Sequence, residues 1–366
     1  MLIPVFTVYA TQLSDATPTR IGLALGAYGL TQGLLQIPFG MLSDRFGRKP
    51  LITLGLVLFA LGSLWGALTT SIGGMILART LQGMGAIGSV LIALLADLTE
   101  DRQRTKAMAV IGMSIGVSFS LAMIISPAIA LYTGLSGIFF LTMILALLGL
   151  LLLHLVIPNP SSAHHPVVRK GLFLQALANR HLQRLNIGIF CQHFILTATF
   201  FAIPFLLQEQ MHLNHLSEQW HFYLPLMIFS FLLMIPCLLI AEKKHQVKSL
   251  FVGSTLITGL CQLTLAFTYS HWHALCGLLF TYFVVFNNLE ALLPSLVSKQ
   301  ANPESKGTAM GIYSSSQFLG LFAGGVTAGV VYPFAGHQGI FIVNSLLALL
   351  SLVTACYLQI SVKTNP

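Results

Sequence analysis

Long apolar segments separated by short polar ones run along the whole sequence. Each segment is about 20 residues long, the length that an α-helix needs to cross the roughly 30 Å hydrocarbon core of a bilayer. Eleven of these segments lie at residues 20–42, 51–70, 72–96, 107–132, 137–157, 186–207, 220–241, 249–269, 274–297, 308–332 and 338–359. The pattern predicts an all-α polytopic membrane protein.

The segment at residues 1–13 is also apolar, but as a helix it spans only about 20 Å. We interpret it as the outer part of a first helix, which gives twelve spans with the first one truncated. Such a helix leaves about 10 Å of the bilayer core uncovered. We therefore expect the natural reading frame to extend upstream by roughly 10–25 residues.

Composition supports the membrane interpretation. Hydrophobic residues make up 55% of the chain and charged residues only 8%. Soluble domains carry roughly a quarter charged residues, and disordered chains combine low hydrophobicity with high charge. Both classes are therefore excluded.

The net charge of +8 does not indicate a nucleic-acid partner, because the basic residues are segregated. Sixteen of the eighteen Lys and Arg residues fall in alternate gaps between the spans or in the C-terminal tail. Basic loops stay in the cytoplasm. The bias predicts a multi-pass protein of the cell (inner) membrane with both termini cytoplasmic.

Neither the cysteines nor the histidines suggest a cofactor or metal. All five cysteines lie inside apolar spans, where we expect them to pack. The twelve histidines are mostly in loops, without the carboxylate or thiolate neighbours of a metal site.

Two glycine motifs are misleading. Residues 83–88 match G-x-G-x-x-G and residues 112–116 match G-x-S-x-G, but both lie inside apolar spans. The first motif belongs between a strand and a helix, and the second belongs on a strand-to-helix turn. We expect these small residues to let helices pack closely.

The longest hydrophilic gap, residues 158–185, follows the sixth span and predicts a cytoplasmic linker. It separates an N-terminal six-helix bundle (1–157) from a C-terminal one (186–366). The halves are related, since a shift of 202 residues aligns 104–110 with 306–312. Duplicated bundles around a central site are a transporter plan.

Three motifs carry a family resemblance. Residues 40–50, Gly-Met-Leu-Ser-Asp-Arg-Phe-Gly-Arg-Lys-Pro, resemble the loop signature between helices two and three of the major facilitator superfamily. Residues 79–86 resemble its helix-four motif, and residues 1–6 resemble the end of the helix-one motif of its drug:proton antiporter branch. The helix-five motif is degraded, with Ser126-Pro127 where Gly-Pro is usual.

Further similarity to the YajR-type inner-membrane transport proteins of this branch lies at His193, 196–198, 287–290, 293–296 and 306–317. The resemblance covers essentially the whole chain and implies a major facilitator fold. It also implies that Asp44, Arg48 and Asp97, with Gly40 in the same motif, form a charge relay that latches the outward-facing state. A solvated charge cluster is the alternative.

Two ionisable residues, Arg79 and Glu290, lie deep in the spans. Each costs about 2.5–3.5 kcal/mol at a helix centre, so we expect each to face a cavity or a partner. Glu290 is our candidate proton carrier, and the resemblance implies a part for Arg79 in proton coupling. His193 is a second titratable candidate. A structural salt bridge is the alternative.

Polar stripes at helical spacing occur in both halves and predict a central substrate cavity. They consist of Tyr28, Gln32 and Gln36; His193 and Thr197; Asn287 beside Glu290; and Tyr313 and Gln317. Hydrogen bonding between helices is an equally good explanation for any one of them.

The sequence therefore predicts a secondary transporter, with proton-coupled export of small amphipathic molecules as the first hypothesis. Uptake of a small metabolite is the alternative, and a non-transporting paralogue or sensor is a third. No nucleophile–base pair or metal constellation suggests an enzyme. We expect the partners to be a small-molecule substrate, protons and the lipid bilayer, and the protein to be a monomer.

Overall fold

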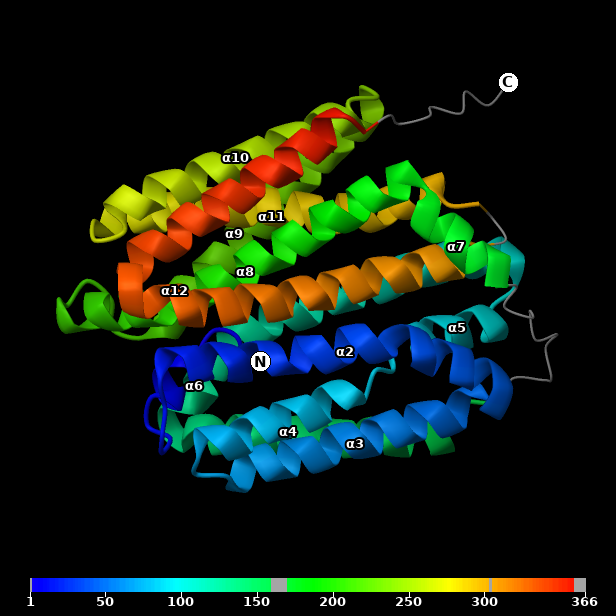
Figure 1. Ribbon diagram of the computed structural model, residues 1–366, viewed down its shortest axis with the longest axis horizontal. Helices are drawn as coiled ribbons and strands as arrows, with labels where there is room; N and C mark the ends of the chain where they lie inside the picture. Colours follow the sequence, from blue (N-terminus) through cyan, green and yellow to red (C-terminus); the bar gives the residue numbers. More distant parts are fainter. Residues whose placement is uncertain (1, 159–169, 303–304, 359–366) are drawn as a thin grey trace.

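The computed structural model describes residues 2–158, 170–302 and 305–358, which are helical almost throughout (Figure 1). The helices in chain order are α1 (Phe6–Ala10), α2 (Pro18–Phe46), α3 (Arg48–Leu68), α4 (Ile72–Met84), α5 (Gly88–Leu98), α6 (Asp101–Leu155), α7 (Lys170–Ala178), α8 (Arg180–His212), α9 (Gln219–Lys243), α10 (Val247–Thr268), α11 (Trp272–Gln300) and α12 (Lys306–Cys356).

Each of the eleven full-length predicted spans overlaps one of these helices, or two of them in the case of 72–96. Within the described residues, eight helical segments are long and apolar enough to cross a membrane. Two of them, in α6 and α12, hold two predicted spans each. The remaining span is α2, in which several glycines and two glutamines interrupt the apolar sequence.

α6 and α12 are each bent at one glycine into two helical arms. Gly134 has φ 63° and ψ −158°, and Gly336 has φ 57° and ψ −154°. This backbone conformation is open essentially to glycine alone. The two glycines lie 202 residues apart, the offset of the sequence repeat, so the duplication extends to the backbone.

The predicted span at 72–96 is present, but it is not one continuous helix. α4 ends at Met84 and α5 begins at Gly88. A Cβ on Gly85 would lie 2.4 Å from the carbonyl oxygen of Gly55 on α3, and one on Gly83 would lie 2.3 Å from that of Tyr28 on α2. These glycines bring three backbones together, and the helix breaks at that contact.

The region predicted as a linker contains a helix. α7 lies within 158–185, and α8 begins at Arg180, before the predicted start at 186. The side chain of Asn179 caps α8 by accepting hydrogen bonds from the backbone N–H groups of His181 and Leu182. Residues 159–169 lie outside the described residues.

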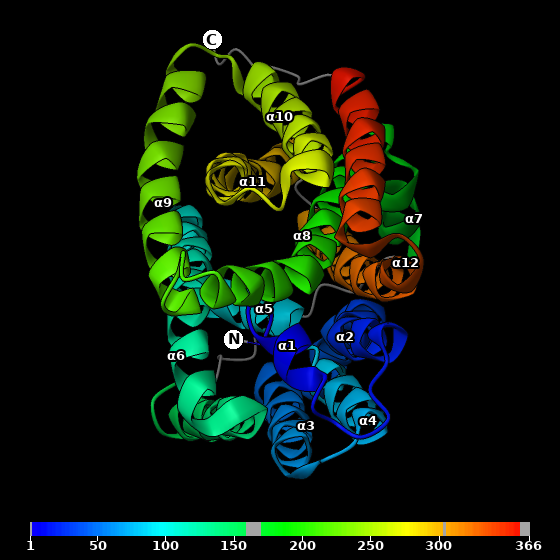
Figure 2. The ribbon, with the colours of Figure 1, turned by 90° about the vertical axis from the view of Figure 1, so that its left-hand side faces the viewer.

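The helices form two groups, α1–α6 and α8–α12, which are seen end-on in Figure 2. Between the groups, α2 packs on the first arm of α12, α6 on α9, and α1 on α8. The contact of α2 with α12 is lined by glycine. A Cβ on Gly22 would lie 2.3 Å from the carbonyl oxygen of Gly325, and one on Gly29 would lie 2.6 Å from that of Phe318. Without side chains between them, the two backbones touch. We call this contact the glycine seam.

The buried core differs between the two ends of the bundle. One end carries the basic residues Arg48, Lys49, Lys243 and Lys299, and we call it the basic end. At the opposite end a single cluster, the shared core, contains buried side chains from both groups. Its members include Phe6, Ile72, Phe139, Phe200, Tyr223 and Phe341.

At the basic end the buried side chains form two separate clusters. One contains Phe39, Ile52 and Val90 of the first group. The other contains Leu185, Leu293 and other residues of the second group, and Ile37 of α2 is the described residue of the first group that packs against it. The two groups therefore share a core at one end and separate toward the basic end.

Candidate functional site

Glu290 lies on α11 and is held by side-chain amides from two other helices. Gln192 on α8 donates from Nε2 to Oε2 at 3.3 Å, and Gln317 on α12 donates from Nε2 to Oε1 at 3.3 Å. The side chain of Glu290 is still 37% exposed, although the residue lies far from both ends of its helix. A carboxylate in this setting can exchange a proton without losing its protein partners.

His193 completes this cluster. Its Nε2 lies 3.7 Å from Oε2 of Glu290 and 2.8 Å from Nε2 of Gln317. Its ring lies 6.0 Å from that of Phe286. The structure therefore brings together three residues that the sequence placed on separate stripes, Glu290, His193 and Gln317.

The backbone around Glu290 is weakened by a proline. Pro294 lies four residues later inside α11 and has no N–H to donate to the carbonyl of Glu290. In membrane helices such a freed carbonyl is tolerated where neighbouring groups or water can satisfy it. The sequence thus places a weak point of the helix directly at the acid inside the span.

The other predicted residues of the second half surround this cluster without joining it. Asn287 turns to α9, where its Nδ2 donates to Oγ of Ser230 at 3.1 Å. Thr197 and Tyr313 are buried, and within the described residues their hydroxyl groups have no hydrogen-bond partner.

Arg79 on α4 is the buried charge of the first half. Its guanidinium lies 4.7 Å from the ring centroid of Tyr28, and Nη1 donates to Oε1 of Gln82 at 2.8 Å. Gln82 in turn donates to Oγ of Ser63 on α3 at 2.8 Å. Within the part of the chain that the structure describes, Arg79 forms no ion pair with Glu290 or any other acid.

The remaining predicted residues of α2 point to different neighbours. Gln32 is hydrogen-bonded to Gln36 at 3.5 Å, and the carbonyl of Gln36 accepts from Oγ of Ser89 on α5 at 2.8 Å. Tyr28 instead contacts the other group, with its ring 6.1 Å from that of Phe318 in an edge-on arrangement. Of this stripe, Tyr28 is the residue that contacts both Arg79 and α12.

Sequence reasoning missed several partners. Gln192 directly precedes His193, and Gln82 lies one helical turn after Arg79, so a search for amides beside the buried charges finds both. Phe119 and Phe286 pair across the two groups at 6.4 Å, but nothing in their spacing distinguishes them from lipid-facing aromatic residues.

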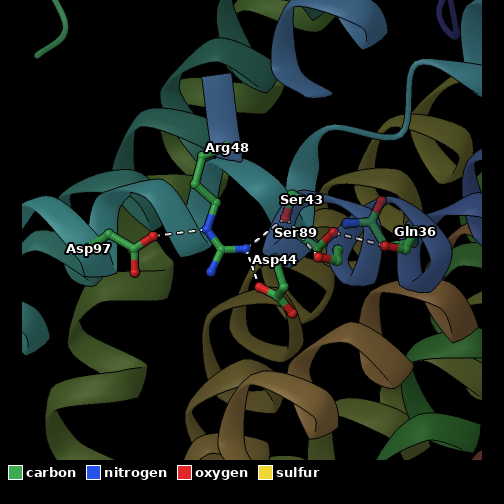
Figure 3. A network of polar contacts seen from close by, with 7 residues as sticks. Gln36, Ser43, Asp44, Arg48, Ser89 and Asp97 are labelled. Carbon is green, nitrogen blue, oxygen red and sulfur yellow. Dashed lines mark hydrogen bonds and ion pairs between the residues drawn. The ribbon is translucent and has the colours of Figure 1, made fainter. Parts of the chain in front are cut away.

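A second charged cluster lies at the basic end (Figure 3). Arg48 donates from Nε to Oδ2 of Asp97 at 2.8 Å and from Nη1 to Oδ1 of Asp44 at 2.5 Å. The Nη1 atom also donates to Oγ of Ser43 at 2.7 Å. The structure therefore joins the three charged residues of the predicted relay. Their described ion pairs link α2, α3 and α5, which all belong to the first group.

Two glycines shape this cluster. Gly47, with φ 92°, lies between α2 and α3 and turns the chain so that Arg48 lies beside Asp44. Gly40 brings α5 close to α2, since a Cβ there would lie 3.3 Å from Oγ of Ser89.

The described residues contain no group of three or more His, Cys, Asp or Glu side chains that could hold a metal ion.

Comparison with known proteins agrees with this geometry. The family model described as Major Facilitator Superfamily matches residues 1–286 and 187–366. The inner membrane transport protein YajR of Escherichia coli (strain K12) is 43% identical over 361 residues, covering 97% of this chain and 78% of YajR.

Two solved structures share the fold. The D-xylose-proton symporter matches with a TM-score of 0.77 at 15% identity, over 98% of this chain and 93% of that one. The human organic anion transporter MFSD10 (TETRAN) matches with a TM-score of 0.67 at 23% identity, over 95% and 88%.

The chain belongs to the major facilitator superfamily. The all-helical fold of two six-helix groups predicted from the sequence is confirmed. The protein is a multi-pass membrane transporter rather than an enzyme.

Proposed function

We propose that this protein is a proton-coupled exporter of small amphipathic molecules in the inner membrane. The observation that carries the proposal is the Glu290 cluster, in which a carboxylate deep in a span keeps protein partners and is 37% exposed. A group that must bind and release a proton during each cycle needs both properties. The helix-one motif at residues 1–6 favours the drug:proton antiporter branch.

In this proposal, the difference in packing between the two ends of the molecule identifies its conformational state. The basic end is cytoplasmic by the positive-inside rule, so in this proposal the second arm of α12 ends on the cytoplasmic side, whereas α1 lies beside the shared core at the opposite end. The shared core then closes the outer side, and the separate clusters leave the groups apart on the cytoplasmic side. This is the inward-facing arrangement of alternating access.

Protonation of Glu290 drives the cycle by shifting the population between the two states. In this proposal the path of the substrate and the protons is lined or supported by Arg79, His193, Tyr28, Gln32, Gln36, Thr197, Asn287, Tyr313 and Gln317. The protein acts as a monomer, since both groups come from one chain.

Proton-coupled uptake is the second candidate. The degraded helix-five motif at Ser126-Pro127 favours it, and the fold is shared with a symporter. The fold itself serves both directions.

Inverted membrane vesicles separate these functions. We expect an imposed proton gradient, acid inside, to drive accumulation of at least one dye from an amphipathic panel. Release of a preloaded metabolite down the same gradient indicates uptake in the cell, and no response to either condition indicates a non-transporting protein.

We expect Asp44→Asn to lower turnover about fivefold, the effect of roughly 1 kcal/mol on a two-state equilibrium. The change removes one carboxylate from Arg48 without touching the Glu290 cluster. Transport rate and cysteine accessibility on both faces report the shift. Asp15→Asn, in a loop at the opposite end, is the matched control. Unchanged rate and labelling would identify the group as a solvated charge cluster.

A further inference from the structure

Among the described residues, Arg79 is a buried cation without a counter-ion. The residue is only 8% exposed, and its Nε atom is buried without a hydrogen-bond partner among the described residues. Its described partners are one neutral amide and one aromatic ring. Burying a charge is costly unless the charge is paired. In this conformation the positive charge of Arg79 is therefore removed from water without a negative partner among the described residues.

In the described part of the structure, the chain itself supplies no acid that pairs with Arg79. Asp44 and Asp97 are engaged with Arg48. Glu209 and Glu218 lie near the ends of α8 and α9 opposite the basic end, and Glu242 lies at the basic end of α9. Glu290, the acid inside a span, is held by Gln192 and Gln317.

We propose that the transported molecule is an organic anion whose carboxylate or sulfonate group pairs with Arg79. This inference rests on the proposed transport function and adds the charge of the substrate. The guanidinium is pre-organised, because Tyr28 covers one face and Gln82, fixed by Ser63, holds Nη1. An arginine held in this way presents its other N–H groups as a fork that matches a carboxylate.

Aromatic rings at two contacts between the groups are candidates for the apolar part of the site. Tyr28 pairs with Phe318 across one contact between the groups, and Phe119 pairs with Phe286 across another. Tyr28, Phe119 and Phe318 are only half-buried, so parts of their rings remain available. Tyr28, which also lies 4.7 Å from the Arg79 guanidinium, is the ring that would contact the apolar body of a molecule whose anionic group pairs with Arg79.

The charge of the substrate has an energetic consequence. The membrane potential is negative on the inside, so it favours outward movement of an anion. Export of an anion is thus assisted by the same potential that draws protons inward.

Three dansyl probes test the proposal on the full-length protein in lipid nanodiscs. They are dansylglycine (anionic), its amide (neutral) and dansylcadaverine (cationic). We expect dansylglycine to bind at least tenfold more tightly than the amide, the effect of one charge-assisted hydrogen-bonded pair. Arg79→Gln should reduce this ratio to about one, and Arg79→Lys should retain part of it. Arg20→Gln removes the same charge in an exposed region and should leave the ratio unchanged.

Two results would overturn the proposal. One is wild-type protein that binds dansylglycine no better than its amide, or does not bind it. The other is an Arg79→Gln variant that keeps the preference and elutes as a monodisperse protein. Binding is measured without a proton gradient, so failure here leaves proton coupling untouched, and failure of proton-driven transport leaves the charge preference standing.

Discussion

Replacing Glu290 with glutamine is expected to abolish proton-driven transport and to leave substrate binding and membrane insertion intact. Glutamine has the shape of glutamate, and its one oxygen can still accept a hydrogen bond from Gln192 or Gln317, but it cannot carry a proton. Purified variant and wild-type protein in liposomes, with an imposed pH gradient, give the rates to compare. We expect the variant to fall to the background rate of empty liposomes.

The matched control is Glu242→Gln, which removes an exposed carboxylate at the basic end of α9. It should transport at the wild-type rate. Full proton-driven transport by Glu290→Gln would remove this residue from the coupling mechanism.

The second large effect is expected at the glycine seam. In Gly22→Ala the new methyl group would lie 2.3 Å from the carbonyl oxygen of Gly325 and 2.8 Å from Cα of Gly329. Both are backbone atoms, so the two groups must move apart. Overpacking of this kind costs about 1–3 kcal/mol, which shifts a two-state equilibrium by about five- to 150-fold.

A cysteine at Thr7 reports this shift in a background without the native cysteines. Thr7 is fully buried on α1 beside the shared core, so maleimide reaches it only when the outer side opens. We expect faster labelling in Gly22→Ala. Gly253→Ala on α10 is the control, because its methyl group would meet nothing within 4 Å. Equal labelling of the two variants would show that the seam does not govern opening.

The helices were predictable because their signal is local. A bilayer requires about 20 consecutive apolar residues, and each span satisfies this requirement within its own sequence. The break between Met84 and Gly88 was not predictable in this way. It depends on the contact of Gly85 with Gly55 on another helix, and the sequence of one helix alone does not indicate that contact.

In the candidate site, too, the local features were predictable from the sequence and the contacts between helices were not. Glu290, Arg79 and His193 stood out because ionisable and polar groups are rare inside spans. The pairing of Glu290 with His193 and Gln317, and the turn of Asn287 toward Ser230, depend on how α8, α9, α11 and α12 are rotated. The sequence specifies that rotation only through the packing of the whole bundle.

The shared core also bears on how the protein is made. The ribosome releases Phe6, Ile72 and Phe139 long before it has synthesised Phe200, Tyr223 and Phe341, the members of the same cluster that come from the second group. Lipid tails cover such apolar side chains as well as protein does. The first half can therefore be folded in the bilayer, with its basic-end core complete, before the second half is synthesised. Assembly then ends with two preformed halves docking at their outer ends. Two fragments divided between the halves and produced in the same cell should therefore reassemble, whereas either fragment alone would lack half of its outer core.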